Sequence, residues 1–236
     1  VGPGDRVATV ANTVTATVSA IVATGARPVF VDTDPDTMLM DAAALGRTLA
    51  RVGAVKVVLP VHLYGLGCDL AAIVPAARAH GARVLEDCAQ AHGARLGPRA
   101  AGAVGDLAAF SFYPTKNLGA FGDAGAVTGA DAAPLERVRL LRQYGWRTRY
   151  VADEHGRNSR LDELQAAVLR VRLARLDAEN AHRARLARRY LDALAGGPLR
   201  LPVVPAGFVP AWHQFAVRTP ARDALRAHLE SHGIHC

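Results

Sequence analysis

The sequence predicts an α/β fold in which a mostly parallel sheet is sandwiched by helices. Several short runs are apolar or β-branched on both faces, which suits strands buried inside a parallel sheet. Stretches with helical patterns separate several of these runs, and this alternation is typical of crossover connections. Half of the 236 residues are hydrophobic, so the chain can bury a sizeable core.

The expected secondary structure differs between two parts of the chain. Up to Gly129, strands are expected over residues 27–34, 55–65, 83–90, 106–113 and 125–129. Helices are expected within residues 12–24 with Gly25 as C-cap, from Asp41 to Val52, and from Asp69 to Gly81 despite Pro75.

After Gly129 the pattern predicts mostly helix. We expect a helix over residues 131–145, an irregular polar loop over 146–160 and one long helix over 161–194. The long helix has an apolar stripe at helical spacing, formed by Leu161, Leu164, Val168 and Val171. A Pro/Gly-rich hinge over 195–211, a strand over 212–219 and a helix over 221–233 complete the pattern.

Composition narrows the class of protein. The net charge is +7, and arginines concentrate in RVRLLRQYGWRTR and HRARLARRY, which are interpreted as solvated helix faces. Aromatic residues make up 6% of the chain and no nucleic-acid motif occurs, so nucleic-acid binding is only a weak alternative. No apolar run is long enough to span a membrane, and the start does not resemble a signal peptide. The odd number of cysteines, three, and their spacing suggest no zinc site, and predict a reduced, cytoplasmic protein.

Polar side chains are expected where two strands end. Asp87 and Gln90 close one expected strand, and Ser111, Thr115 and Lys116 follow another. Ligands of open α/β sheets bind at the carboxyl ends of strands. An amine for a Schiff base, an acid for a pyridinium nitrogen and hydroxyls for a phosphate are what pyridoxal 5'-phosphate requires.

Each of these residues also has a plainer interpretation when taken alone. Asp87 could only cap the next helix, and Lys116 could be a surface lysine. Lys56 and Lys116 are, however, the only lysines among 28 basic Lys and Arg residues. Arginine stays protonated and forms no stable imine, so a position that needs imine chemistry must keep lysine. Lys56 is interpreted as an ordinary strand-edge residue.

Several motifs carry a family resemblance over nearly the whole chain. EDCAQAHGA followed by GDLAAFSFYPTKNLGAFGDAGAVTG resembles the DegT/DnrJ/EryC1/StrS family of sugar aminotransferases. GPGDRV, ATGARPVFVDTDPDT, PVHLYG and GRNSRLDELQAAVLRVRL match as well. The resemblance implies the type I aminotransferase fold of the aspartate aminotransferase superfamily, in which one strand is antiparallel; GAVTG is the candidate for that strand.

The resemblance also implies residue roles. Lys116 would bind the cofactor covalently and act as general base and acid, while Asp87 would hold the pyridine nitrogen. Gln90 would lie near the phenolic oxygen and Ser111 would bind the phosphate. Asn158 would reach the phosphate of a neighbouring subunit's cofactor, which makes the polar loop a homodimer element. Outside this resemblance, His92 either contacts the ring-binding residues or the substrate, or is a plain helix histidine.

The chain departs from the family pattern in two ways. Val14 stands where relatives usually have an aromatic residue that stacks on the cofactor ring. The family's segments before GPGD and after GIHC are absent, which predicts an internal fragment that binds the cofactor poorly by itself. Residues 1–194 would form the large domain without its N-terminal part, and residues 195–236 the start of a small C-terminal domain.

The function implied is transfer of an amino group from glutamate to a nucleotide-linked keto-deoxysugar. The variant of the lysine motif resembles enzymes acting on dTDP-linked sugars in antibiotic or surface-polysaccharide pathways. Two alternatives remain. One is a related sugar dehydratase, although such relatives replace the lysine, typically by histidine. The other is a regulatory protein that keeps the fold without turnover.

Overall fold

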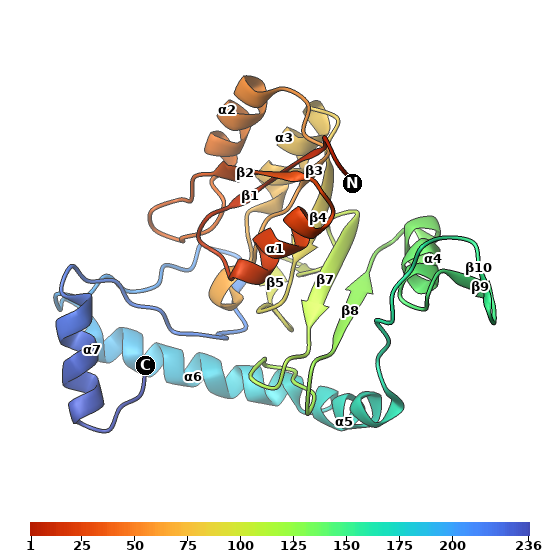
Figure 1. The fold of residues 1–236 in the computed structure, drawn as a ribbon. Coiled ribbons are helices and arrows are strands. Elements are labelled where there is room, and N and C mark those ends of the chain that lie inside the picture. Colours follow the sequence, from red (N-terminus) through yellow and green to blue (C-terminus); the bar gives the residue numbers. More distant parts are fainter.

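A computed structural model describes all 236 residues and places a six-stranded sheet at the centre of the fold (Figure 1). Along the sheet the order is β2 (Arg27–Val31), β1 (Arg6–Val10), β3 (Val57–Val58), β4 (Arg83–Asp87), β7 (Leu107–Ser111) and β8 (Gly125–Thr128). All neighbours pair in parallel except β7 and β8, which are antiparallel. The prediction that GAVTG is the antiparallel strand is therefore confirmed.

The sequence pattern did not predict β1, and it predicted a longer strand than the observed β3. In β1 the side chains from Val7 to Val10 are buried on both faces, and the Thr9 hydroxyl donates to the Leu59 carbonyl at 2.9 Å. The expected strand over 55–65 is regular only at Val57–Val58, because Pro60 has no N–H for the ladder. Beyond it, the short 3₁₀ turn η1 (Leu63–Gly65) includes Tyr64 in the left-handed region, at φ 61°.

Crossover helices cover the two faces of the sheet. Helices α2 (Ala42–Val52) and α3 (Leu70–Ala79) lie on one side of β1, β2 and β3, and α1 (Thr15–Ala23) lies on the other (Figure 1). Asp41 and Asp69, where these two helices were expected to begin, are their N-caps and accept backbone N–H groups at 2.9 and 3.2 Å. The main core, with fully buried Leu45, Leu49, Ile73 and Val58, fills the space between the sheet and α2 and α3.

The segment after β8 contains more regular structure than expected. Helix α4 (Ala132–Leu141) is followed by a hairpin of β9 (Trp146–Thr148) and β10 (Val151–Ala152), where an irregular loop was predicted. The Trp146 ring lies 4.9 Å from the Tyr144 ring and 5.3 Å from the Tyr150 ring, so an aromatic cluster stabilises the hairpin. The two strands of this hairpin are too short to show an alternation of apolar and polar residues. The sequence pattern therefore did not predict them.

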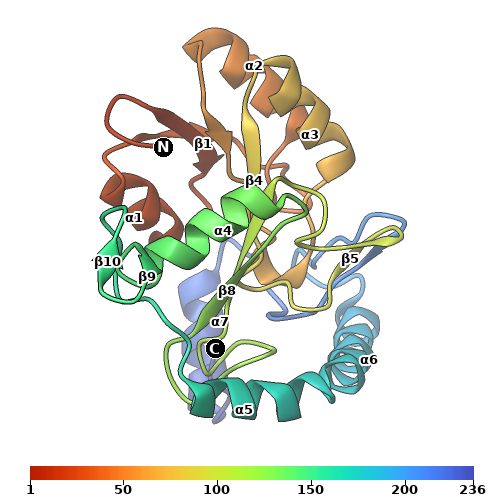
Figure 2. The same cartoon turned by 90° about the vertical axis from the view of Figure 1, so that its right-hand side faces the viewer.

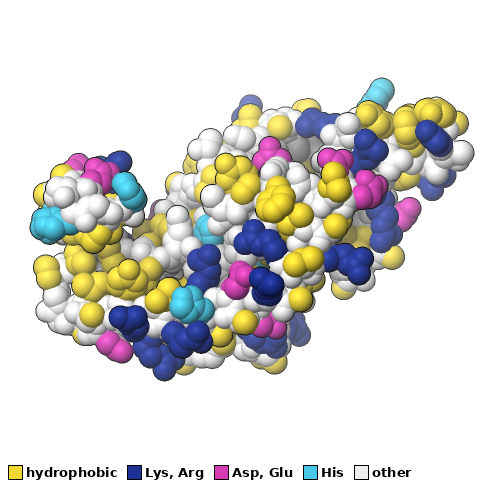
Figure 3. Space-filling view, turned by 90° about the horizontal axis from the view of Figure 1, so that it is seen from below, with side chains coloured by type: hydrophobic (Ala, Val, Ile, Leu, Met, Phe, Trp, Pro, Cys, Tyr) yellow, Lys and Arg dark blue, Asp and Glu magenta, His cyan; other side chains and the backbone are white.

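The predicted long helix is two helices, α5 (Glu163–Leu173) and α6 (Leu176–Leu194), which meet at an angle (Figure 2). The break allows Leu169 and Leu176 to pack together with Leu118 of the Lys116 loop. The apolar stripe expected on this segment is not covered within the chain, because Leu164 is 83% exposed and Val171 is 63% exposed. Figure 3 shows such hydrophobic side chains between basic ones on the underside of the molecule.

The C-terminal segment differs from its predicted strand. Residues 212–219 form no strand; only Arg218 pairs, in a single bridge with Arg200. Trp212 has φ 47°, which interrupts the extended conformation that a strand needs. A small sheet forms instead from β11 (Phe208–Val209), β5 (Arg95–Leu96) and β6 (Arg99–Ala100). The last predicted helix is confirmed as α7 (Arg222–Ser231).

No helix of the structure has both the length and the apolar composition needed to cross a membrane.

Candidate active site

The carboxyl ends of β1, β4 and β7 point to one edge of the sheet, above α6 in Figure 1. Asp87 is the last residue of β4 and Ser111 the last of β7. Gln90 lies in the turn after β4, and Lys116 in the loop between β7 and β8. The four residues that the sequence placed at strand ends therefore share this edge.

Asp87 is half-buried and held from two sides. Its Oδ2 accepts the Thr17 hydroxyl at 2.8 Å, and its Oδ1 accepts the Ala89 N–H at 3.1 Å. Thr17 is in turn 2.8 Å from the hydroxyl of Thr13, which lies just before α1. Thr17 was missed by sequence reasoning; two threonines four residues apart at the start of a helix were the available signal. The carboxylate keeps free lone pairs beyond these two contacts.

Gln90 is buried and its amide is oriented. Its Oε1 accepts the Tyr64 N–H at 2.6 Å, so the oxygen faces the turn after β3. The NH₂ group of Gln90 is therefore the part that remains able to donate to a ligand.

The two lysines lie in different surroundings. Lys56 is exposed and pairs with Asp5 at 3.1 Å at the opposite end of the sheet. Lys116 is half-buried and has no salt-bridge partner. Burial lowers the pKa of Lys116, and this effect outweighs the charge of Asp87, which acts in the opposite direction. A larger fraction of the Lys116 amine is thus neutral at a given pH than for a solvated lysine.

The loop around Lys116 is tightly folded. Lys116 N–H donates to the Tyr113 carbonyl at 2.9 Å, and Ala120 N–H to the Phe112 carbonyl at 2.7 Å. A Cβ at Gly119 would lie 2.5 Å from the Pro114 carbonyl oxygen, so this position requires glycine. Ser111 Oγ accepts the Tyr113 N–H at 3.3 Å and remains partly accessible.

Asn158 is not brought to the other site residues within this chain. It is exposed, bridges to Gln143 beside the hairpin, and its Oδ1 accepts from Arg160 Nε at 3.2 Å. Its role in a neighbouring subunit stays a prediction. The place of Val14 against the cofactor ring also stays a prediction. Val14 is 53% exposed and precedes α1, which carries Thr17.

His92 is buried at 3% exposure, and neither ring nitrogen has a hydrogen-bond partner. Its ring lies 5.6 Å from the Phe110 ring and 5.8 Å from the Phe112 ring. Burial in these surroundings lowers the pKa of His92 to about 4, so the ring is neutral near pH 7. Buried polar atoms without partners are uncommon, and here they lie beside the candidate site.

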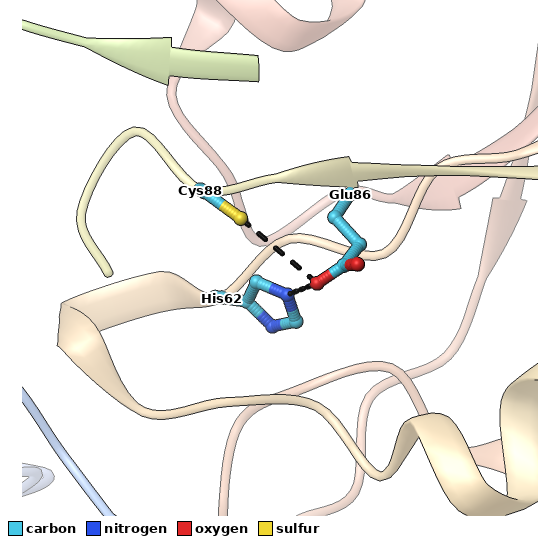
Figure 4. A group of neighbouring side chains, drawn as sticks. All are labelled: His62, Glu86 and Cys88. Atoms are coloured by element: carbon cyan, nitrogen blue, oxygen red, sulfur yellow. Dashed lines mark hydrogen bonds and ion pairs between the residues drawn. The ribbon is translucent and has the colours of Figure 1, made fainter. Parts of the chain in front are cut away.

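His62 forms a second buried group with Glu86 and Cys88, the two residues next to Asp87 in the sequence (Figure 4). Glu86 accepts His62 Nε2 at 2.9 Å and three backbone N–H groups, from Gly102, Val104 and Gly105, at 2.7, 2.9 and 2.6 Å. Burial alone would raise the pKa of Glu86, but these donors outweigh it and lower the pKa.

The group is a hydrogen-bonded anchor and not a metal centre. His62 Nδ1 accepts the Cys68 N–H at 2.9 Å, which places the ring proton on Nε2, facing Glu86. Both ring nitrogens are thus in use, and Glu86 is satisfied by backbone donors. Burial raises the pKa of the Cys88 thiol.

Comparisons with known proteins agree with the geometry. The model of the DegT/DnrJ/EryC1/StrS aminotransferase family matches residues 1–236. The chain is 48% identical over 235 residues to a dTDP-3-amino-3,4,6-trideoxy-alpha-D-glucose transaminase of Streptomyces venezuelae, covering 99% of this chain and 62% of that protein. It is 46% identical to a UDP-N-acetyl-3-dehydro-alpha-D-glucosamine 3-aminotransferase of Acidithiobacillus ferrooxidans, covering 99% of this chain and 63% of that protein.

Among solved structures, the crystal structure of Streptomyces venezuelae DesV in complex with a ketimine intermediate superposes with a TM-score of 0.96 at 48% identity. The match covers 99% of this chain and 63% of that one. The chain thus spans about three fifths of the length of the proteins it matches here. The predicted fold class is confirmed.

Replacing Glu86 by Gln should destabilise the fold strongly. Every group around the carboxylate is a donor, so the new NH₂ must face an N–H and leave it unpaired. We expect a loss of about 3 kcal/mol in the free energy of unfolding, measured by urea denaturation. Glu136→Gln, which breaks only a surface pair with Arg139, is the control and should change it by less than about 0.5 kcal/mol. Equal stability of both variants would contradict the anchor.

His92 should make the protein less stable as the pH falls. Its pKa is about 4 when folded against an ordinary value of 6.5, so between these values the unfolded chain binds a proton that the folded chain does not. The free energy of unfolding should therefore fall on acidification by up to ~1.4 kcal/mol per pH unit in this window. His92→Phe should reduce the slope measured by denaturation at several pH values, and the slope that remains should include His213, whose pKa burial also lowers to about 4. Phe112→Leu should lower stability but retain the slope; a parental slope in His92→Phe would exclude this role.

Proposed function

Because the chain belongs to the DegT/DnrJ/EryC1/StrS aminotransferase family, we propose that it forms the cofactor-binding part of an enzyme that transfers an amino group to a nucleotide-linked keto-deoxysugar. The cofactor is pyridoxal 5'-phosphate. The observation that carries the proposal is the meeting of Asp87, at the end of β4, and Lys116, in the loop after β7, at one edge of the sheet, close enough for the Asp87 charge to act on the amine.

The residues present fit this cofactor. Lys116 has an unpaired amine, Asp87 has free carboxylate lone pairs, and Gln90 has an uncommitted NH₂ group. Ser111, at the end of β7, offers a partly accessible hydroxyl for the phosphate. Acid, amide, hydroxyl and amine thus match the pyridine nitrogen, the phenolic oxygen, the phosphate and the aldehyde of the cofactor.

When bound, pyridoxal 5'-phosphate supplies an electron sink for the carbon that carries the amino group. Lys116 Nζ would hold the cofactor covalently and would also accept a proton and return it. The lowered pKa of Lys116 favours both tasks, because only the neutral amine is a nucleophile and a base. The Asp87 carboxylate holds a proton on the pyridine nitrogen, and Thr17 fixes its direction.

The amino donor in this proposal is glutamate, and the acceptor is a dTDP-linked ketosugar. The 48% identical relative is named for a dTDP-linked sugar and the 46% identical one for a UDP-linked sugar, so dTDP is favoured by a small margin. The same enzyme accepts both partners in turn, in a ping-pong cycle. We place it in the cytoplasm and in antibiotic or surface-polysaccharide biosynthesis.

The complete enzyme would be a homodimer with shared active sites. Asn158 would reach the cofactor phosphate of the neighbouring subunit from its exposed position beside the hairpin. In this proposal residues 1–194 belong to the large domain and residues 195–236 begin the small one.

Lys116 should be the lysine that binds the cofactor. We expect borohydride reduction of the chain mixed with pyridoxal 5'-phosphate to label Lys116 in preference to Lys56, read by peptide mass spectrometry. Covalent trapping also records weak binding. Lys116→Arg should abolish this label, whereas Lys56→Arg should retain it. Equal labelling of both lysines would sink the assignment.

The whole subunit, expressed from its complete coding sequence, should aminate a dTDP-linked 3-keto or 4-keto-6-deoxysugar with glutamate. Product mass and 2-oxoglutarate release are the measurements. Asp87→Asn should lower the rate on the order of 10²-fold, because the ring nitrogen loses its charged partner. A UDP-linked ketosugar is the comparison substrate. Amination of the UDP-linked sugar alone would contradict the dTDP assignment, and amination of neither would contradict the proposed function.

A further inference from the structure

Asn117, the residue after Lys116, lies at the centre of a buried polar network. It is 3% exposed, and its amide makes three contacts to distant parts of the chain. Nδ2 donates to Asn180 Oδ1 at 2.9 Å and to the Ala211 carbonyl at 2.7 Å. Oδ1 lies 3.0 Å from His213 Nδ1. Both amide protons and the amide oxygen of Asn117 are thus engaged.

The direction of every bond in this network is determined. The Ala211 and His92 carbonyls can only accept, so each must face the NH₂ group of an asparagine. Asn180 Nδ2 accordingly donates to the His92 carbonyl at 2.8 Å, and its Oδ1 faces Asn117. Asn117 Oδ1 then faces His213, which must carry its proton on Nδ1.

The network joins four segments that are far apart in the sequence. The Lys116 loop contributes Asn117, α6 contributes Asn180, the turn after β4 contributes the His92 carbonyl, and the C-terminal segment contributes Ala211 and His213. The network is closely packed. At Gly93, the residue after His92, an added Cβ would lie 2.6 Å from Asn180 Nδ2.

Helix α5 holds the other end of the same loop. Arg172 Nη1 donates to the Gly119 carbonyl at 2.7 Å, and Gln165 Oε1 accepts the Phe121 N–H at 2.8 Å. No contact among these involves the Lys116 side chain, which stays available for chemistry. The backbone of Lys116 is nevertheless confined between its own bond to Tyr113 and the buried amide of Asn117.

We propose that Asn117 is a positioning residue that keeps the Lys116 amine partly buried, by tying the lysine loop to residues 211–213. This inference rests on the proposed function of Lys116 but concerns a different property. The C-terminal segment and the Lys116 amine are then positioned together. His213 of that segment donates to the side-chain amide of Asn117, which lies between Lys116 and the turn at Gly119.

The presence of only two lysines makes a direct test possible. In the chain labelled with ¹³Cε-lysine, NMR should show two lysine signals whose shifts report protonation, and Lys116→Arg assigns them. In Asn117→Ala the titration midpoint of Lys116 should rise by ~0.5 pH unit or more, because the freed loop lets water reach the amine. The Lys56 signal is the internal reference.

Substitutions at His213 distinguish the effect of its hydrogen bond to Asn117 from a general loss of packing. His213→Ala removes the donor and should raise the Lys116 midpoint as Asn117→Ala does. His213→Asn can place an amide N–H where Nδ1–H was and should restore the parental midpoint. Ile73→Val, in the core behind the sheet, should lower stability without moving the midpoint.

An unchanged Lys116 midpoint in Asn117→Ala and in His213→Ala would overturn the proposal, and so would a His213→Asn variant that behaves like His213→Ala. If Asn117→Ala does not fold, the comparison of His213→Ala with His213→Asn still tests the proposal. The titration needs no cofactor. Failure of the cofactor-trapping experiment with these shifts present would therefore reject the proposed function and leave the positioning role intact.

Discussion

The structure depends most on one buried carboxylate, Glu86. A buried charge costs several kcal/mol unless donors surround it, and here His62 and three N–H groups of residues 102–105 do so. Gly105 permits this approach, because a Cβ there would lie 2.9 Å from the Val84 carbonyl. The contacts fix the end of β4 against the turn after β3 and the loop before β7.

This anchor also determines where Asp87 points. Successive side chains of a strand face opposite sides of the sheet, so burying Glu86 on one face turns Asp87 to the other. On that face Thr17 of α1 meets it at 2.8 Å. A shift of one residue in β4 would exchange the two acids and place the ligand-facing carboxylate in the core. The adjacent acids thus divide two tasks, one structural and one available for chemistry.

The sequence predicted the strand-end residues better than their supports. Asp87, Gln90, Ser111 and Lys116 could be found because the end of a buried strand is visible in a local pattern. The side chains of Asp87 and Gln90 are held by Thr17 and Tyr64, which are 70 and 26 residues away, and no local pattern reveals such pairs.

The elements that were mispredicted have a physical cause in common. The residues 161–194 have one continuous helical pattern, but the break before Leu176 follows from packing on Leu118, which is remote in sequence. Residues 212–219 read as a strand by composition, yet their hydrogen bonds go to Asn117 and α6 through Ala211, Trp212 and His213. The exposed Leu164 and Val171 have the spacing of a buried stripe but are not covered by any element of this chain. In each case tertiary contacts decide what periodicity leaves open.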